Sequence, residues 1–134
     1  MKTQLTTIAF VMTLLLSALT GCSKLSGLKE GGIYQYSNGN GTYSVIKILK
    51  VESGGVHVRL YSNLFDSPPT KIDESKLYLV GREAKANETI GQADAPWTSS
   101  SFSSKNPVFV QQSTVSAQEL EGYNDWAKGN HTYF

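Results

Sequence analysis

The chain has 134 residues, with twelve Lys and Arg against eleven Asp and Glu, one cysteine and two histidines. This length predicts a single domain, and a formal charge of +1 gives no electrostatic basis for a nucleic-acid partner. One cysteine excludes an internal disulfide, and together with two histidines it is a poor ligand set for zinc, so we expect no metal or other cofactor.

The N-terminus has the pattern of an export signal. Lys2 precedes an uncharged run from Ile8 to Leu19, and small residues follow it. Twelve residues rise only about 18 Å as a helix, which is too short for a hydrocarbon core about 30 Å thick. Residues 1–21 are therefore predicted to be a cleaved signal peptide rather than a spanning helix.

The sequence Leu19-Thr20-Gly21-Cys22 resembles the lipobox of bacterial lipoproteins, whose cysteine is acylated and becomes the first residue after cleavage. This resemblance implies a lipid anchor on Cys22 and a location in the bacterial cell envelope. Ser23 follows the cysteine, and by resemblance to enterobacterial lipoproteins it implies the outer membrane, facing the periplasm. The alternative is an ordinary signal peptide with a chance cysteine, which would leave a free thiol in an oxidising compartment.

The mature chain is predicted to have a tether at residues 22–30 and one β-rich domain at residues 31–134. Strands are expected at residues 33–37, 42–51 and 56–62, the first two joined by the hairpin signal Asn38-Gly39-Asn40-Gly41. Residues 75–80 are expected to form a fourth strand and residues 108–110 a fifth. Residues 82–107 are the least regular stretch, so either Trp97 and Phe102 hold it on the core or part of it is disordered.

One helix is predicted to close the chain. Ser116 and Glu119 have the spacing of a capping box, and Gly129 is a plausible end. Tyr123 and Trp126 are expected on neighbouring positions of the helix surface. Replacing Ser116 by Ala is expected to cost about 1 kcal/mol, and replacing Glu119 by Ala less.

These elements predict a mainly β fold, either a small SH3-like barrel or a curled antiparallel sheet of about five strands with one C-terminal helix. In layout, residues 31–128 resemble the SH3-like small barrels of bacterial envelope and immunity-type domains. A resemblance of layout implies a fold and does not establish a function.

The most suggestive segment for binding is the predicted third strand. Strict alternation places Val56, Val58 and Leu60 on one face and places His57, Arg59 and Tyr61 on the other. The polar face is interpreted either as an ordinary solvated face or as a protein-recognition surface, because Arg and Tyr are enriched at interfaces. Three other aromatic residues either extend that surface or fill the core: Tyr34, Tyr36 and Trp97.

No catalytic residues are predicted, since the chain has no nucleophile-elbow GxSxG string. The favoured function is therefore a non-enzymatic, membrane-anchored, protein-binding module whose partner is an envelope or secreted protein. An immunity- or inhibitor-like protein is its most concrete form. A structural accessory of the outer membrane is the alternative, and an envelope hydrolase is the third.

Overall fold

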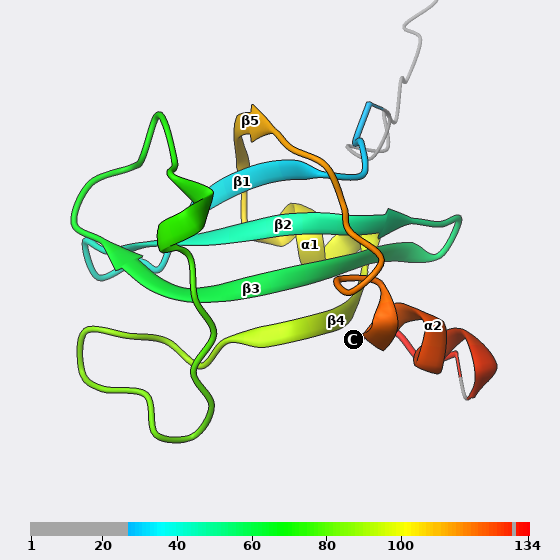
Figure 1. The fold of residues 1–134 in the computed structure, drawn as a ribbon. Coiled ribbons are helices and arrows are strands. Elements are labelled where there is room, and N and C mark those ends of the chain that lie inside the picture. The colour runs from blue at the N-terminus through cyan, green and yellow to red at the C-terminus, as the bar shows by residue number, and fades with distance from the viewer. Residues whose placement is uncertain (1–26, 130) are drawn as a thin grey trace, which may run out of the picture.

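In the computed structural model the described residues, 27–129 and 131–134, form one antiparallel sheet with helices on both faces (Figure 1). The five strands are β1 (Gly32–Ser37), β2 (Tyr43–Val51), β3 (Gly55–Phe65), β4 (Gln92–Thr98) and β5 (Val108–Gln112). Their order in the sheet is β4-β3-β2-β1-β5. The predicted mainly β class is confirmed, and the curled open sheet describes it better than a closed barrel, because β4 and β5 are the two edges.

The first three strands form the predicted meander. The turn between β1 and β2 depends on Gly39 and Gly41, whose φ angles of 80° and 84° favour glycine. The backbone N–H of Asn38 donates to the carbonyl of Thr42 and closes this turn. The pairing of β2 with β3 shifts register at two places, and such bulges bend and twist a sheet.

Two parts of the predicted strand pattern are wrong. Residues 75–80 form no strand: a short 3-10 turn, η1 (Glu74–Lys76), is capped by Asp73, and an extended segment follows it. The fourth strand is β4, within the irregular stretch at residues 82–107, and it pairs with β3. The helix α1 (Ser99–Ser104) follows β4, and its buried Phe102 joins the core, so the alternative that this stretch packs on the core is confirmed.

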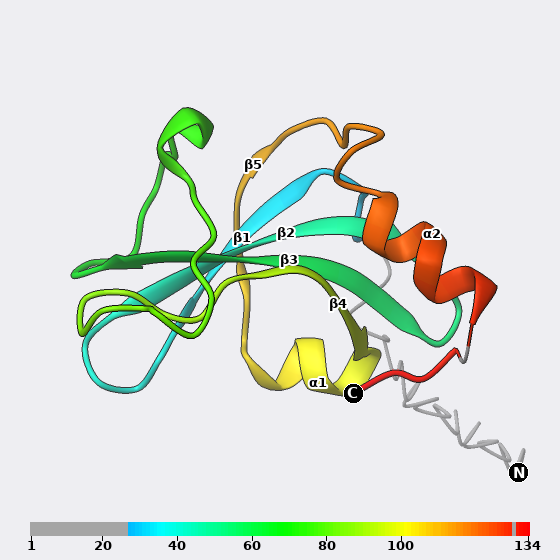
Figure 2. The ribbon, with the colours of Figure 1, turned by 60° about the horizontal axis from the view of Figure 1, so that its bottom comes forward.

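Helices α1 and α2 (Glu121–Lys128) lie on opposite faces of the sheet (Figure 2). On the face of α1, a core forms around Tyr34, Tyr36, Ile46, Val58 and Phe102. On the face of α2, a smaller cluster contains Ile33, Val45, Tyr61 and Ile72. Both sides of the central strands are therefore covered, and their side chains alternate between two cores rather than between core and solvent.

The predicted capping box is confirmed, although the α-helix itself begins two residues after it. The N–H of Glu119 donates to the Ser116 hydroxyl at 3.2 Å, and the N–H of Ser116 donates to Oε2 of Glu119 at 2.8 Å. A turn at residues 117–120 leads into α2. The predicted signal peptide, Cys22 and most of the predicted tether lie outside the described residues.

Candidate functional site

The predicted recognition face, His57, Arg59 and Tyr61, lies on the sheet face that α2 and the segment before it cover. The predicted alternation is present, but the expectation that this face is open to solvent or to a partner is wrong for two of its residues. His57 is 0% exposed and Tyr61 is 7% exposed. Both are buried because chain segments remote in sequence pack over β3, which a local pattern does not reveal.

The other candidate residues also lie mainly in the interior. Tyr34 and Tyr36 belong to the core on the α1 face, where the Tyr34 ring packs edge-on against Phe102 at 5.6 Å. Trp97 lies on the edge strand β4 and is partly buried against the same core. Of the open alternatives for these aromatics, filling the core is the one that the structure adopts.

A buried histidine–aspartate pair lies beneath α2. The Nδ1 of His57 is 2.9 Å from Oδ1 of Asp94, and it must be the donor because a carboxylate only accepts. Asp94 lies against α2, where a Cβ on Gly122 would be only 2.7 Å from the Asp94 Cβ. A glycine at position 122 therefore allows the helix to approach β4 closely.

Aromatic rings enclose the other side of the imidazole. The ring centroids of Tyr123, Trp126 and Tyr133 lie 4.8, 4.4 and 5.8 Å from that of His57. Its Nε2 is buried and has no hydrogen-bond partner among the described residues. The buried pair is thus part of the packing between β3, β4 and α2.

Glu52, in the turn between β2 and β3, fastens the same aromatic cover. It accepts hydrogen bonds from the hydroxyls of Tyr123 and Tyr133, each at 2.6 Å. These two bonds hold the pKa of Glu52 below its usual value. Two adjacent backbone bonds, Thr98 N–H to Phe134 O and Phe134 N–H to Pro96 O, attach the C-terminal residues to the outer edge of β4.

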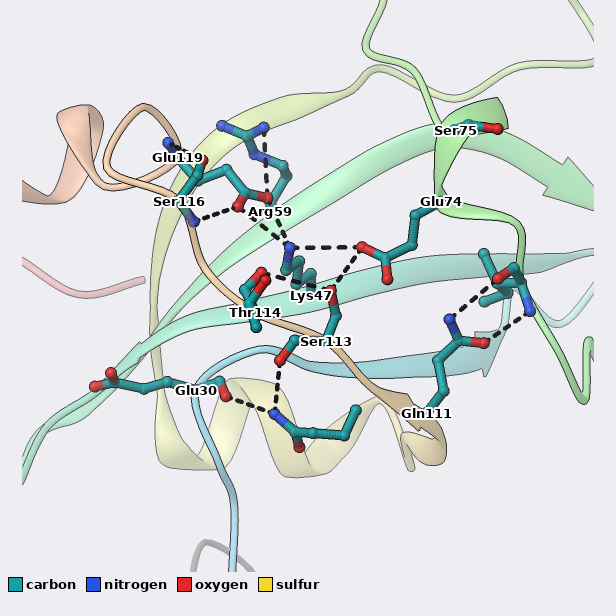
Figure 3. A network of polar contacts seen from close by, with 12 residues as sticks. Glu30, Lys47, Arg59, Glu74, Ser75, Gln111, Ser113, Thr114, Ser116 and Glu119 are labelled. Atoms are coloured by element: carbon teal, nitrogen blue, oxygen red, sulfur yellow. Dashed lines mark hydrogen bonds and ion pairs between the residues drawn. The ribbon is translucent and has the colours of Figure 1, made fainter.

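A second polar cluster lies at the centre of the same face (Figure 3). The Lys47 side chain is 4% exposed, and its ammonium donates to Oε1 of Glu119 at 2.9 Å and lies 3.7 Å from Glu74. Arg59 is 3.9 Å from Glu119, and the Ser113 hydroxyl donates to Glu74. Two cations therefore face two carboxylates, which balances the buried charge.

This cluster sets the ionisation of the groups around it. Burial alone would raise the pKa of Glu119, but the Ser116 N–H and the Lys47 ammonium outweigh burial and lower that pKa. Burial, assisted by the charge of Glu119, raises the pKa of Tyr61 to about 12. The polar groups of this face are thus engaged with one another, and they tie η1 and residues 113–119 to the sheet.

Among the described residues, large hydrophobic side chains reach solvent at three other places, and one of these is Phe134, which is 72% exposed. Tyr78, Leu79 and Ile90 are 39%, 38% and 53% exposed, on loops beyond the end of β3. Val108 and Phe109, on β5, are both 54% exposed. None of these residues was predicted as part of a binding surface, although the uncharged run Val108-Phe109-Val110 was a signal for the second group.

Comparisons with known proteins add no family, because no family model, no curated protein and no solved structure matches the chain. Within the described ranges, no three His, Cys, Asp or Glu side chains gather in a way that would hold a metal ion. Over the same ranges, no helix is long and apolar enough to cross a membrane.

Proposed function

We propose that the protein is a lipid-anchored module of the bacterial cell envelope that binds another protein without catalysing a reaction. The signal-like run ending in Leu19-Thr20-Gly21-Cys22 supports the anchor. The single cysteine lies at the one position where an acylated thiol is needed. More than one acyl chain on this residue would give stable attachment, since each buried methylene contributes about 0.8 kcal/mol.

The observation that carries the binding function is the exposed group Tyr78, Leu79 and Ile90, which we call the loop patch. Leu79 and Ile90 lie on the two limbs of the loop between η1 and β4, which are joined by a hydrogen bond from Gly91 N–H to Val80 O at 2.8 Å. A Cβ on Gly91 would lie 3.0 Å from Leu79, so the two limbs are in close contact. Exposed hydrophobic side chains on adjoining segments are typical of protein-interaction sites.

The position of the loop patch suits a partner that approaches from the periplasm. Gly32 begins β1 close to Gly27, the first described residue, whereas Ser37 ends β1 beside Tyr43 and Phe65. The loops that follow Phe65 therefore leave from the end of the sheet away from Gly27, as Figures 1 and 2 show. An anchor preceding Gly27 would leave the loop patch directed away from the attachment point.

The anchor is tested by changing Cys22→Ser and fractionating cells. We expect the variant to leave the membrane fraction or to accumulate with an uncleaved signal, which its larger mass reveals. A processed variant that stays wholly with the membranes would contradict the anchor.

The loop patch is tested by placing a photoreactive side chain at Leu79 in intact cells. The matched control position is Asp125, on α2, whose side chain is 83% exposed. We expect a discrete adduct with an envelope or secreted protein from position 79 alone. The purified partner should bind Ile90→Ser about tenfold more weakly, which corresponds to 1.4 kcal/mol. Equal adducts from both positions, or unchanged affinity, would contradict the proposal.

The identity of the cross-linked protein also separates the two forms of this function. A secreted toxin or hydrolase would support the immunity- or inhibitor-like form, whereas an outer-membrane assembly component would support the structural form.

A further inference from the structure

The surface beside the first described residues combines hydrophobic side chains with two shallow hollows. One hollow, of about 370 Å³, is lined by Leu28, Tyr34, Phe102 and Pro107 among others. The second, of about 390 Å³, is lined by Gly27, Lys29, Tyr34, Phe109 and Gln112. Tyr34 lines both hollows, so they adjoin along β1 and β5.

The rim of these hollows is the most exposed hydrophobic part of β5. Phe109 is 54% exposed and lines the second hollow, and its ring packs edge-on against Tyr34 at 5.5 Å. Val108 is equally exposed, but it pairs with Gln35 and faces the other side of the sheet. Within the part of the chain that the structure describes, β5 pairs only with β1, and no backbone hydrogen bond covers its outer edge. By contrast, Phe134 covers the other edge of the sheet by its two bonds to β4.

The charge around this surface is positive. From Ala95 to Gln118 the only charged residue is Lys105, which directly precedes the Asn106-Pro107 turn into β5. Lys29 lines the second hollow and is exposed, as is Lys105. The neighbouring acid, Glu30, lies 3.1 Å from Lys50 and is therefore compensated.

The chain itself places this surface near the proposed anchor. Five residue steps separate Gly27 from Cys22, and a fully extended chain of that length spans at most about 18 Å. A lipid on Cys22 would therefore hold Gly27, and with it the hollow that Gly27 lines, within that distance of the headgroups.

We infer that Leu28, Lys29, Lys105 and Phe109, here called the basal patch, dock on the anionic surface of the bilayer that holds the anchor. This inference rests on the proposed lipid anchor and deepens it. Hydrophobic side chains enter the boundary between headgroups and acyl chains, while lysines meet anionic lipid phosphates. Docking fixes the orientation of the domain and directs the loop patch outward.

A second copy of the chain is the competing occupant of the bare edge of β5. Antiparallel pairing of two β5 strands would place Val108 of one copy opposite the Gln112 end of the other. Because Lys105 precedes Val108 and Lys29 lies beside Gln112, this pairing would bring like charges together, which is destabilising. The charge pattern therefore favours an anionic surface.

The test uses the full lipidated protein in vesicles of phosphatidylethanolamine and phosphatidylglycerol whose acyl chains carry bromine, a short-range quencher of indole fluorescence. Phe109→Trp adds an indole to the basal patch, and the matched control Tyr78→Trp adds one to the loop patch. The native Trp97 and Trp126 give the same background in both variants.

We expect brominated lipid to remove most of the emission added by Phe109→Trp and none of that added by Tyr78→Trp. Leu28→Trp, which lines the first hollow, replaces Phe109→Trp if thermal unfolding shows that the latter is not folded. Failure of the protein to float with the vesicles would count against the anchor itself. Flotation with equal quenching of both variants would overturn the docking inference alone. A concentration-dependent dimer that Phe109→Ser abolishes, without quenching, would overturn it in favour of a second copy.

Discussion

His57 Nδ1 lies 2.9 Å from Asp94 Oδ1, and this bond joins two central residues of neighbouring strands beneath α2. The imidazole is fully buried, and three rings from α2 and the C-terminal residues surround it. A polar side chain at the centre of the sheet thus organises the packing of the C-terminal part of the chain.

Removing the Asp94 carboxylate tests how much its hydrogen bond with His57 contributes to the free energy of unfolding. We expect Asp94→Ala to lower the free energy of unfolding by about 1–3 kcal/mol, because it leaves the buried Nδ1–H without an acceptor. Asp94→Asn should cost less, since its amide oxygen still accepts. Denaturant unfolding measures both, with Asp125→Ala as an exposed control that should stay within about 0.5 kcal/mol of wild type. Equal stability of Asp94→Ala and wild type would show that the bond contributes nothing.

The contacts of the capping box reverse the expected order of two substitutions, because the sequence predicted that Glu119→Ala costs less than Ser116→Ala. Ser116→Ala removes one capping bond and should cost about 1 kcal/mol. Glu119→Ala should cost more, about 3 kcal/mol, because it also leaves the buried Lys47 with only the more distant Glu74. Chemical denaturation of the two variants gives the order directly. A smaller loss for Glu119→Ala than for Ser116→Ala would restore the sequence-based expectation.

Tyr61 should make the fold sensitive to alkali. Its pKa is about 12 in the folded protein, against about 10 in the unfolded chain. The neutral Tyr61 side chain therefore contributes about 2–3 kcal/mol to the free energy of unfolding. This contribution is complete below pH 10 and is lost as the pH rises through 12. Between pH 9 and 12, wild type should lose that much more stability than Tyr61→Phe, measured by urea unfolding. Parallel pH profiles would contradict this assignment.

Glu119 should act in the opposite pH range. The pKa of Glu119 is lower in the folded protein than in the unfolded chain. The ionised carboxylate therefore stabilises the fold at a pH above the pKa of the unfolded chain, and this stabilisation is lost as the pH falls through the pKa of the folded protein. Wild type should therefore lose more stability than Glu119→Gln below about pH 4.5. Identical acid profiles of the two proteins would show that the Lys47–Glu119 contact does not favour the ionised carboxylate.

The C-terminal residue protects the edge of β4. Deleting Phe134 removes the acceptor of the Thr98 amide but keeps the bond between Tyr133 and Glu52. We expect faster hydrogen exchange at Thr98, with little change at the Ser62 amide, which donates to Tyr78 O. Unchanged protection of Thr98 would mean that Phe134 does not cover this edge.

Local features of the fold could be predicted from the sequence because the residues that form them lie a few positions apart along the chain. The Asn-Gly turn, the alternation of β3 and the reciprocal bonds of Ser116 with Glu119 each depend on residues a few positions apart. The class of the fold followed from these signals, and it is confirmed.

The wrong predictions concern features that depend on contacts between residues far apart in the sequence. The strand β4 contains Asp94 and Pro96, which disfavour strands, yet pairing with the long β3 holds it at an edge where a missing N–H is tolerated. Residues 77–80 look like a strand, but a single backbone bond, from Ser62 N–H to Tyr78 O, joins them to β3, and the Asn63 and Ser62 side chains accept from the Tyr78 and Val80 amides in place of a ladder. The burial of His57 depends on α2 and Tyr133, more than sixty residues further along the chain.

The lipid anchor is the claim on which the orientation of the loop patch and the basal patch depends. Intact mass spectrometry of the protein extracted from membranes tests it most directly. We predict a chain that begins at Cys22, followed by Ser23, with the added mass of diacylglycerol and an N-linked acyl group on Cys22. A membrane-extracted chain that begins elsewhere, or one whose Cys22 carries no lipid, would contradict it.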